Sequence, residues 1–175
     1  MIDKFIIRGI NMKKIISITL VIYVLFFNIL MAKSDIKGEI DIDKLSSKAK
    51  RTDAHIMIFL HKDYCGFCEK MEKNIASNLI KQEIKKSFIL LSLNIDRDEI
   101  VLYQNFKGSI HKFAKEFGIS LYPTLIFIDE ENKAIYSVVG FRKQEELLDI
   151  LKFVSSKSYK EMDFDTFQSD LEFQE

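Results

Sequence analysis

Residues 54–70 read AHIMIFLHKDYCGFCEK, a short apolar run followed at once by two cysteines three positions apart. The apolar run is too short for a buried helix, so it predicts a central strand. From Asp63 to Lys86 the apolar residues recur near helical spacing, which predicts a helix that is kinked or divided at Asn74 to Asn78. The two cysteines therefore stand where a strand ends and a helix begins.

The motif at this junction is Cys65-Gly66-Phe67-Cys68. Free backbone N–H groups and the positive end of the helix dipole lie at a helix start, where they stabilise a thiolate and make Cys65 the better nucleophile. Cys68 lies one turn further on the same helical face and can close a disulfide with Cys65. Gly66 lets a substrate backbone come close. Phe67 supplies apolar surface and no cation, so the motif lacks the charge that would favour the reduced form.

Three other interpretations compete with redox chemistry at this motif. A structural disulfide is one, but a bond across a single helical turn closes too small a loop to add much stability. A zinc site is another, but it needs two further ligands, and His55, His61 and His111 are scattered with no second cysteine pair. Coincidence is the third. The placement of the motif between strand and helix favours a redox pair.

The rest of the chain alternates between further strands and helices. Strands are predicted at 88–95, 124–128 and 134–139, and helices at 42–50, 109–117 and 143–155. The stretch 99–108 is less regular and predicts an extra strand with a turn at 105–108. This order predicts an α/β fold with a central mixed sheet of four to five strands flanked by helices. The first two strands should be parallel, and the last two should form a hairpin.

Composition excludes several classes of protein. The 175 residues balance 26 basic against 26 acidic side chains, and 47% of them are hydrophobic, as in a globular domain. One proline and six glycines exclude collagen-like and proline-rich linker sequences. A zero net charge gives no electrostatic footprint for nucleic acid, so we expect no such partner.

The N-terminal region has the pattern of an export signal. Residues 15–32 are 18 positions without a charge, preceded by Lys13 and Lys14 and ending at the small Ala32. They predict a signal peptide over 1–32, started at Met1 or Met12, or an uncleaved membrane anchor. We therefore expect a periplasmic protein that contacts the membrane only if this segment is uncleaved.

Three further regions follow the predicted signal. We expect a polar extension with a short helix at 33–53, the main domain at 54–156 and an acidic, aromatic tail at 157–175. The extension shows no dimerisation domain, so we expect a monomer.

Several motifs together resemble thioredoxin-fold proteins over roughly residues 43–156. They are Tyr64-Cys65-Gly66-Phe67-Cys68, Phe117-Gly118-Ile119, Tyr122-Pro123-Thr124 and Val139-Gly140-Phe141. The leader, the 99–108 insert and the tail are similar, more narrowly, to exported thioredoxin-like proteins of the SoxW type.

The resemblance implies a site around the cysteines. It implies a cis bond between Tyr122 and Pro123, although statistics of X–Pro bonds favour trans, with Pro123 packed against the disulfide. It also implies that Cys65 attacks, that Cys68 resolves, and that the Tyr122 backbone pairs with a substrate strand. No cofactor is implied. The substrate-binding residues expected are Tyr64, Gly66, Phe67, Tyr122, Pro123 and Thr124.

The sequence departs from the family pattern in two places. Phe59 stands where thioredoxins carry a buried acid, so His61 or Lys62 would have to assist Cys68, unless both simply face solvent. Tyr64 replaces the usual tryptophan before the first cysteine. Phe141 is expected either in the core or in the wall of the substrate groove.

The resulting hypothesis is an exported reductase of client disulfides, recharged by a membrane electron donor. The alternatives are a disulfide oxidase or isomerase, a non-catalytic binding module, and a metal carrier that uses the thiol pair.

Overall fold

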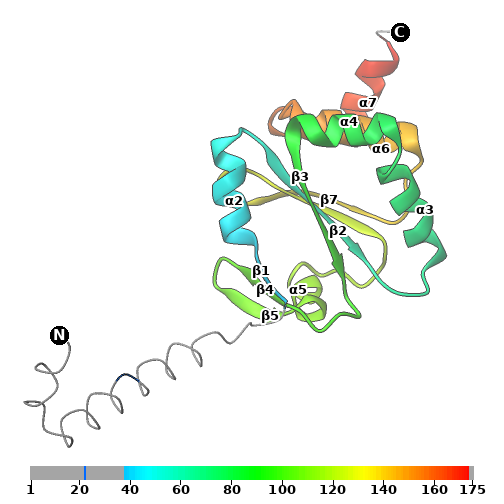
Figure 1. Ribbon diagram of the computed structural model, residues 1–175. Coiled ribbons are helices and arrows are strands. Elements are labelled where there is room, and N and C mark those ends of the chain that lie inside the picture. The colour runs from blue at the N-terminus through cyan, green and yellow to red at the C-terminus, as the bar shows by residue number, and fades with distance from the viewer. Residues whose placement is uncertain (1–21, 23–37, 174–175) are drawn as a thin grey trace, which may run out of the picture. The chain divides into compact units, whose positions relative to one another are not determined.

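The computed structural model describes Ile22 and residues 38–173 (Figure 1). The predicted signal or anchor lies outside the described residues, apart from Ile22. No helix within the described part is both long and apolar enough to cross a membrane.

Four strands form the central sheet in the order β3, β2, β6, β7. They are β2 (His55–His61), β3 (Phe88–Asn94), β6 (Thr124–Ile128) and β7 (Ala134–Val139). Strand β2 runs parallel to β3 and antiparallel to β6, which pairs in turn with β7 as a hairpin. The predicted mixed sheet, its parallel pair and its hairpin are all confirmed.

Helices cover both faces of this sheet (Figure 1). On one face lie α3 (Gly66–Ile75), α4 (Asn78–Ser87) and α6 (Gln144–Ser155); on the other lie α2 (Ile42–Arg51) and α5 (Ile110–Glu116). The predicted division of the long helical stretch falls between α3 and α4.

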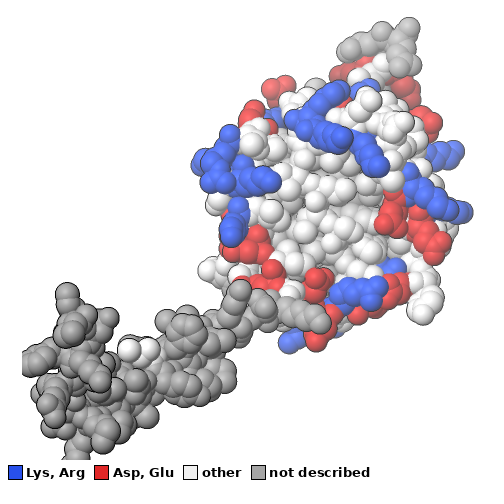
Figure 2. Space-filling view, viewed as in Figure 1, with Lys and Arg blue, Asp and Glu red and all other residues white. Residues whose placement is uncertain are grey.

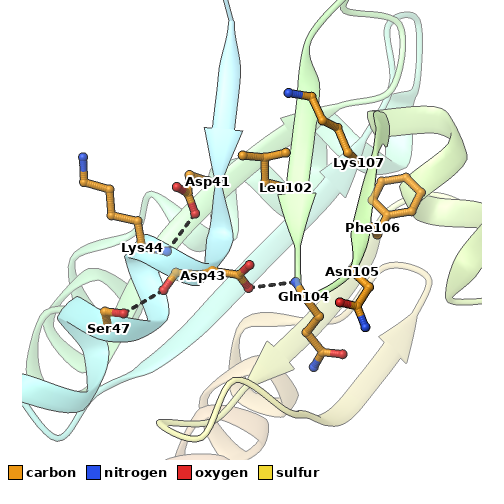
Figure 3. A pocket seen from close by; sticks show the side chains of 9 residues that line it. All are labelled: Asp41, Asp43, Lys44, Ser47, Leu102, Gln104, Asn105, Phe106 and Lys107. Carbon is orange, nitrogen blue, oxygen red and sulfur yellow. Dashed lines mark hydrogen bonds between the residues drawn. The ribbon is translucent and has the colours of Figure 1, made fainter.

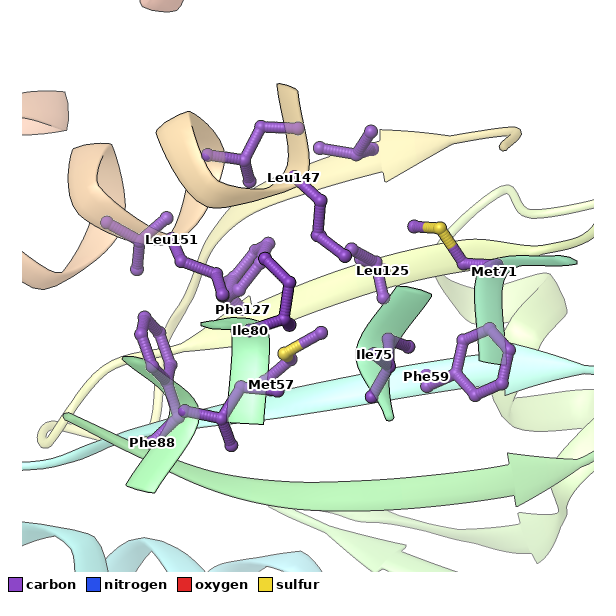
Figure 4. Close-up of a cluster of buried hydrophobic side chains, with 14 of the residues drawn as sticks. Met57, Phe59, Met71, Ile75, Ile80, Phe88, Leu125, Phe127, Leu147 and Leu151 are labelled. Atoms are coloured by element: carbon purple, nitrogen blue, oxygen red, sulfur yellow. The ribbon is translucent and has the colours of Figure 1, made fainter. Parts of the chain in front are cut away.

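Strand β2 explains why the core has two halves. Its side chains alternate, so Met57 and Phe59 pack among the side chains of α3, α4 and α6, as Figure 4 shows. Ile58 and its two apolar neighbours on the same side pack against α2 and α5. A strand buried on both faces reads as a continuous apolar run, and this property made β2 recognisable in the sequence.

A second, three-stranded sheet lies outside the central one. It consists of β1 (Glu39–Asp41), β4 (Ile100–Tyr103) and β5 (Phe106–Ser109), with β4 in the middle. The turn predicted at 105–108 is misplaced, because Gly108 lies within β5 and pairs with Val101. A Cβ at Gly108 would come within 2.8 Å of the Phe106 ring, so this glycine serves packing and not a turn.

Residues 38–53 and 157–173, the described parts of the two predicted flanking regions, belong to the compact domain. Ile42 and Ala49 of α2 are fully buried, so the domain begins before residue 54. The tail forms a 3₁₀ turn, η2 (Ser158–Lys160), and helix α7 (Phe164–Glu172). The Phe164 ring lies 5.5 Å from that of Phe153, so the start of α7 covers the core.

Candidate active site

The chain between β2 and α3 is held in place by the end of β3. The backbone N–H of Asp63 donates to the Asp96 carboxylate at 2.8 Å, and the Asn94 side-chain amide donates to the Asp63 carboxylate at 2.7 Å. Tyr64 then adopts a left-handed conformation with φ of 54°. These contacts fix the direction in which the chain enters α3.

Cys65 is the N-cap residue of α3, as its position in the sequence predicted. Its Sγ accepts the backbone N–H of Cys68 at 3.2 Å. The two sulfur atoms form a disulfide, with an S–S distance of 2.08 Å. Cys65 is half-buried, whereas Cys68 is 4% exposed, so a reagent from solvent reaches Cys65 first. When the disulfide is reduced, the N–H groups at this helix start stabilise a negative sulfur.

The loop before β6 lies beside this sulfur. The Tyr122–Pro123 bond is cis, as the resemblance implied, and the trans bond favoured by X–Pro statistics is wrong. The Tyr122 carbonyl oxygen is 4.0 Å from Cys65 Sγ, and Pro123 is buried. Thr124 is also buried, and its hydroxyl donates to the Leu121 carbonyl at 2.7 Å. Its side chain therefore closes the loop, and its part in substrate binding stays a prediction.

Exposed aromatic side chains lie next to the half-buried Cys65. Tyr64 is fully exposed and Phe67 is 60% exposed. The Phe67 ring lies 6.2 Å from that of Phe141, and Lys70 Nζ lies 5.5 Å from the centre of the Phe67 ring. Nothing lies within 4 Å of a Cβ placed on Gly66, so this position is open to an approaching chain.

Phe141 packs against the core, which is one of the two places expected for it, and it also lies near the apolar side chains around Cys65. Its loop is fastened to α3, because the Asn74 side-chain amide donates to the Arg142 carbonyl at 2.9 Å. Sequence reasoning missed the role of Asn74, because an asparagine near a helix end carries no signal for a contact so distant along the chain.

Comparison with known proteins fits this geometry. The family model described as "Thioredoxin-like domain" matches residues 42–155. The chain belongs to the thioredoxin-like domain family. No curated protein matches the chain significantly.

Two solved structures share the thioredoxin-like fold. A thioredoxin-fold protein from Helicobacter pylori is 19% identical, with a TM-score of 0.59, and the match covers 74% of this chain and 93% of that one. A thioredoxin from Thermus thermophilus is 16% identical, with a TM-score of 0.53, and the match covers 67% of this chain and 85% of that one. At such identities the likeness shows the fold alone.

The thioredoxin-like site departs from its family beneath α3. Phe59 is 3% exposed and stacks on His61, with ring centres 4.9 Å apart. His61 Nε2 lies 3.0 Å from the Ser92 hydroxyl, and burial lowers the pKa of His61, partly offset by the charge of Glu72. His61 is thus a half-buried imidazole on the same sheet face as α3, whereas Lys62 is exposed to solvent.

Two further exposed apolar residues belong to the thioredoxin-like domain near the cis bond. Leu121, immediately before Tyr122, is 65% exposed, and Val139, which pairs with Thr124, is 45% exposed. Both extend the apolar surface around the site. Their sequence context is that of ordinary strand and loop residues, so nothing marked them in advance.

The thioredoxin-like domain has a hollow beside its small sheet, away from the cysteines, shown in Figure 3. This cavity of about 510 Å³ is lined largely by polar groups that bond to one another. The Asp41 carboxylate accepts the N–H of Lys44 at 2.8 Å, and the Asp43 carboxylate accepts the N–H of Gln104 at 2.8 Å and the amide of Asn132 at 2.6 Å. Asp41 therefore caps α2, and Asp43 holds α2, the β4–β5 turn and the β6–β7 turn together. Within residues 38–173, no three side chains of His, Cys, Asp or Glu gather as metal ligands.

Proposed function

We propose that this protein is an exported thiol:disulfide oxidoreductase that reduces disulfides of client proteins through Cys65 and Cys68. The observation that carries the proposal is the half-buried Cys65, whose sulfur accepts an N–H at the start of α3 and bonds to a buried Cys68. This asymmetry is what attack by one sulfur and resolution by the other require.

The reaction transfers two electrons from the protein to the client. In the reduced protein, the Cys65 thiolate attacks one sulfur of a client disulfide, so a mixed disulfide forms and the second client sulfur leaves as a thiolate. Cys68 then loses its proton and attacks the Cys65 sulfur. The Cys65–Cys68 disulfide forms, and the first client sulfur leaves as a thiolate that takes up a proton.

Phe67, between the two cysteines, supports electron transfer from the protein to the client. Phe67 brings no positive charge to stabilise the reduced form, in contrast to a strong oxidant. Reduced protein must be regenerated after each turnover, and a membrane electron donor is the source that we propose, because a periplasm is otherwise kept oxidising.

The surface around Cys65 supports a client in extended conformation. Tyr64, Phe67 and Leu121 offer apolar contacts, and the Tyr122 carbonyl near the sulfur offers a backbone acceptor. An extended segment that pairs with this backbone would present its own disulfide to Cys65.

Trapping tests the proposed reaction directly. A Cys68→Ala variant leaves the mixed disulfide unresolved, so client proteins remain bound to Cys65 and separate from it only under reducing conditions. The matched control is the Cys65→Ala/Cys68→Ala double variant, which must trap nothing. If the two variants retain the same proteins, the redox function is refuted.

A redox titration tests the direction of electron flow. The protein has no tryptophan, so the dithiol fraction is best measured by alkylation and mass shift after equilibration in glutathione buffers. A potential near the roughly −270 mV of thioredoxin supports a reductase, whereas one near the roughly −120 mV of a strong oxidant assigns the protein to disulfide formation. N-terminal sequencing after export tests cleavage behind Ala32.

A further inference from the structure

Strand β3 has an unprotected outer edge. It is the last strand of the central sheet, and among residues 38–173 only β2 pairs with it. Its seven residues, FILLSLN, contain no charge and no proline, and its register with β2 shows no bulge. Charged residues, prolines and bulges normally prevent an edge strand from pairing with another chain. Because β3 has none of the three, its edge can accept a further strand.

An apolar cavity lies beside the same edge. Leu90, 40% exposed, and Ser92 project from β3 toward α3 and α4 and help to line a hollow of about 310 Å³. The rest of the lining comes from four apolar residues and three charged ones: Phe59, Ile75, Ala76, Ile84, Glu72, Lys81 and Lys85. A side chain from an added strand would bury its apolar surface here.

Charge is distributed unequally along the edge. Lys81, Lys85 and Lys86 are exposed on α4, which leads into the start of β3, whereas Asp96 and Asp98 are exposed just after its end. Figure 2 shows an uncharged area across the middle of this face, with basic side chains along α4 above it and acidic side chains, some beside basic ones, below it. The intervening Arg97 is paired with Asp63 at 3.3 Å, and Lys86 is paired with Glu83 of its own helix at 3.1 Å. A second β3 strand therefore fits beside the first in antiparallel orientation, because only that orientation places the basic end of one strand beside the acidic end of the other.

We propose that a second copy of this chain binds here, so that two β3 strands pair antiparallel about a two-fold axis at Leu91. In this register Leu90 of one copy lies opposite Ser92 of the partner subunit and covers the apolar cavity of the other copy. Lys86 lies toward Asp96 of the partner subunit. The two central sheets then form one continuous eight-stranded sheet.

The proposed dimer differs from the expectation of a monomer, which rested on the lack of a dimerisation domain in the sequence. Here the sheet itself supplies the interface. Cys65 and Cys68 take no part, so this proposal is independent of the redox function.

The molar mass of the full chain in solution gives the first test. We expect sedimentation equilibrium to show a reversible dimer whose dissociation constant rises several-fold as salt is increased, because the charges at both ends of β3 are exposed. Leu90→Lys removes two buried leucines from a symmetric dimer and should raise the dissociation constant roughly 100-fold. The matched control is Leu79→Lys, which changes a leucine of similar exposure on α4, 48% against 40%, and should leave the dimer intact.

Cross-linking tests where the two copies meet. In a Cys65→Ser/Cys68→Ser background, Leu91→Cys should be joined to its counterpart by a short bismaleimide, and Leu79→Cys should not. All variants retain residues 1–37, so association through that segment would affect them equally. A monomeric wild type, equal dimerisation of the Leu90→Lys and Leu79→Lys variants, or a folded Leu91→Cys variant that does not cross-link would overturn the proposal. An edge occupied by a client segment in place of a second copy would overturn it as well.

Discussion

The two histidines at the ends of β2 differ in their burial and in their hydrogen bonds. His61, at the cysteine end, contacts the Ser92 hydroxyl and stacks on Phe59. His55, at the tail end, is 2% exposed, and neither of its ring nitrogens has a hydrogen-bond partner; its Nε2 lies 3.8 Å from the Glu130 carboxylate. Burial is the main cause that lowers the pKa of both residues.

This difference extends to the regions around the two residues. At the cysteine end, the backbone and neighbouring side chains satisfy the polar groups, while apolar side chains such as Tyr64 and Phe67 stay exposed. At the tail end, aromatic rings are covered, while the Tyr159 hydroxyl and one Glu130 oxygen are buried without a hydrogen bond. Exposed apolar surface serves contact with other molecules, and unpaired buried polar groups lower stability. Substitutions at the cysteine end should therefore change activity, and those at the tail end should change stability.

The largest expected effect comes from Cys65→Ser. The hydroxyl that replaces the thiolate is a far weaker nucleophile, so the rate of disulfide reduction should fall to background, a loss of roughly a thousandfold or more. The measurement is the rate of reduction of a protein disulfide such as insulin. Under reducing conditions the free energy of unfolding should stay within about 0.5 kcal/mol of the wild type. A residual rate close to that of the wild type would contradict the assignment of the nucleophile.

Phe153→Ala should show the opposite pattern. The Phe153 ring is 2% exposed and lies within 5.5 Å of the rings of Tyr136, Phe164 and Phe167. Its removal leaves a cavity and should lower the free energy of unfolding by about 3–5 kcal/mol, as measured in urea. The rate per folded molecule should not change. Phe173→Ala is the control, because that ring is 90% exposed at the end of α7 and its loss should cost little. If the two variants lost the same free energy of unfolding, the packing of Phe153 under Phe164 and Phe167 of α7 would be contradicted.

A smaller effect is expected from Lys157→Met. Lys157 Nζ donates to the Glu130 carboxylate at 2.6 Å and lies 3.4 Å from that of Asp53. The hydrogen bond from Lys157 holds the pKa of Glu130 below its usual value. The variant leaves this carboxylate without its cation, so unfolding should become easier by about 1–3 kcal/mol. Adding Glu130→Gln should recover part of the loss, and no recovery would mean that the pair does not act as a unit.

The smallest effect concerns pH. Both β2 histidines have a pKa below 6.5 in the folded protein, so between that lowered value and 6.5 the unfolded chain binds more protons. Stability should therefore fall as pH is lowered from 7.5 to 5.5, by at most about 1.4 kcal/mol per pH unit for His55. His55→Phe should flatten this slope, measured as urea midpoints at three pH values, without changing the rate of reduction. An unchanged slope would mean that His55 does not titrate differently in the two states.

Local patterns made much of the fold predictable. Three such patterns each span only a few residues. They are the apolar run at β2, the Ser109 cap that accepts the N–H of Lys112 at 3.3 Å, and the left-handed Gly118 after α5. The same holds for the Cys65 cap of α3, because strand, turn and helix follow directly in the chain. The disulfide-forming cysteine pair at the start of a helix was therefore predictable from one short segment.

Features that depend on distant contacts escaped the sequence. Strand β1 has only three residues, and it is defined by pairing with β4 some sixty positions later. The division of residues 99–108 into two strands was missed because Gly108 resembles a turn residue when the Phe106 ring above it is unknown. The burial of Thr124 was missed for the same reason, since its hydroxyl is satisfied only once the loop before β6 has folded.

One hydrogen bond behind the cysteines has a consequence for molecules that bind in front of them. Because Asn74 bonds to the Arg142 carbonyl, helix α3 and the loop that carries Phe141 are fastened together. The two segments that carry Phe67 and Phe141 therefore keep their places in the absence of any other molecule, and their rings lie 6.2 Å apart. An apolar surface that is already formed would lose little conformational entropy when the proposed client covers it.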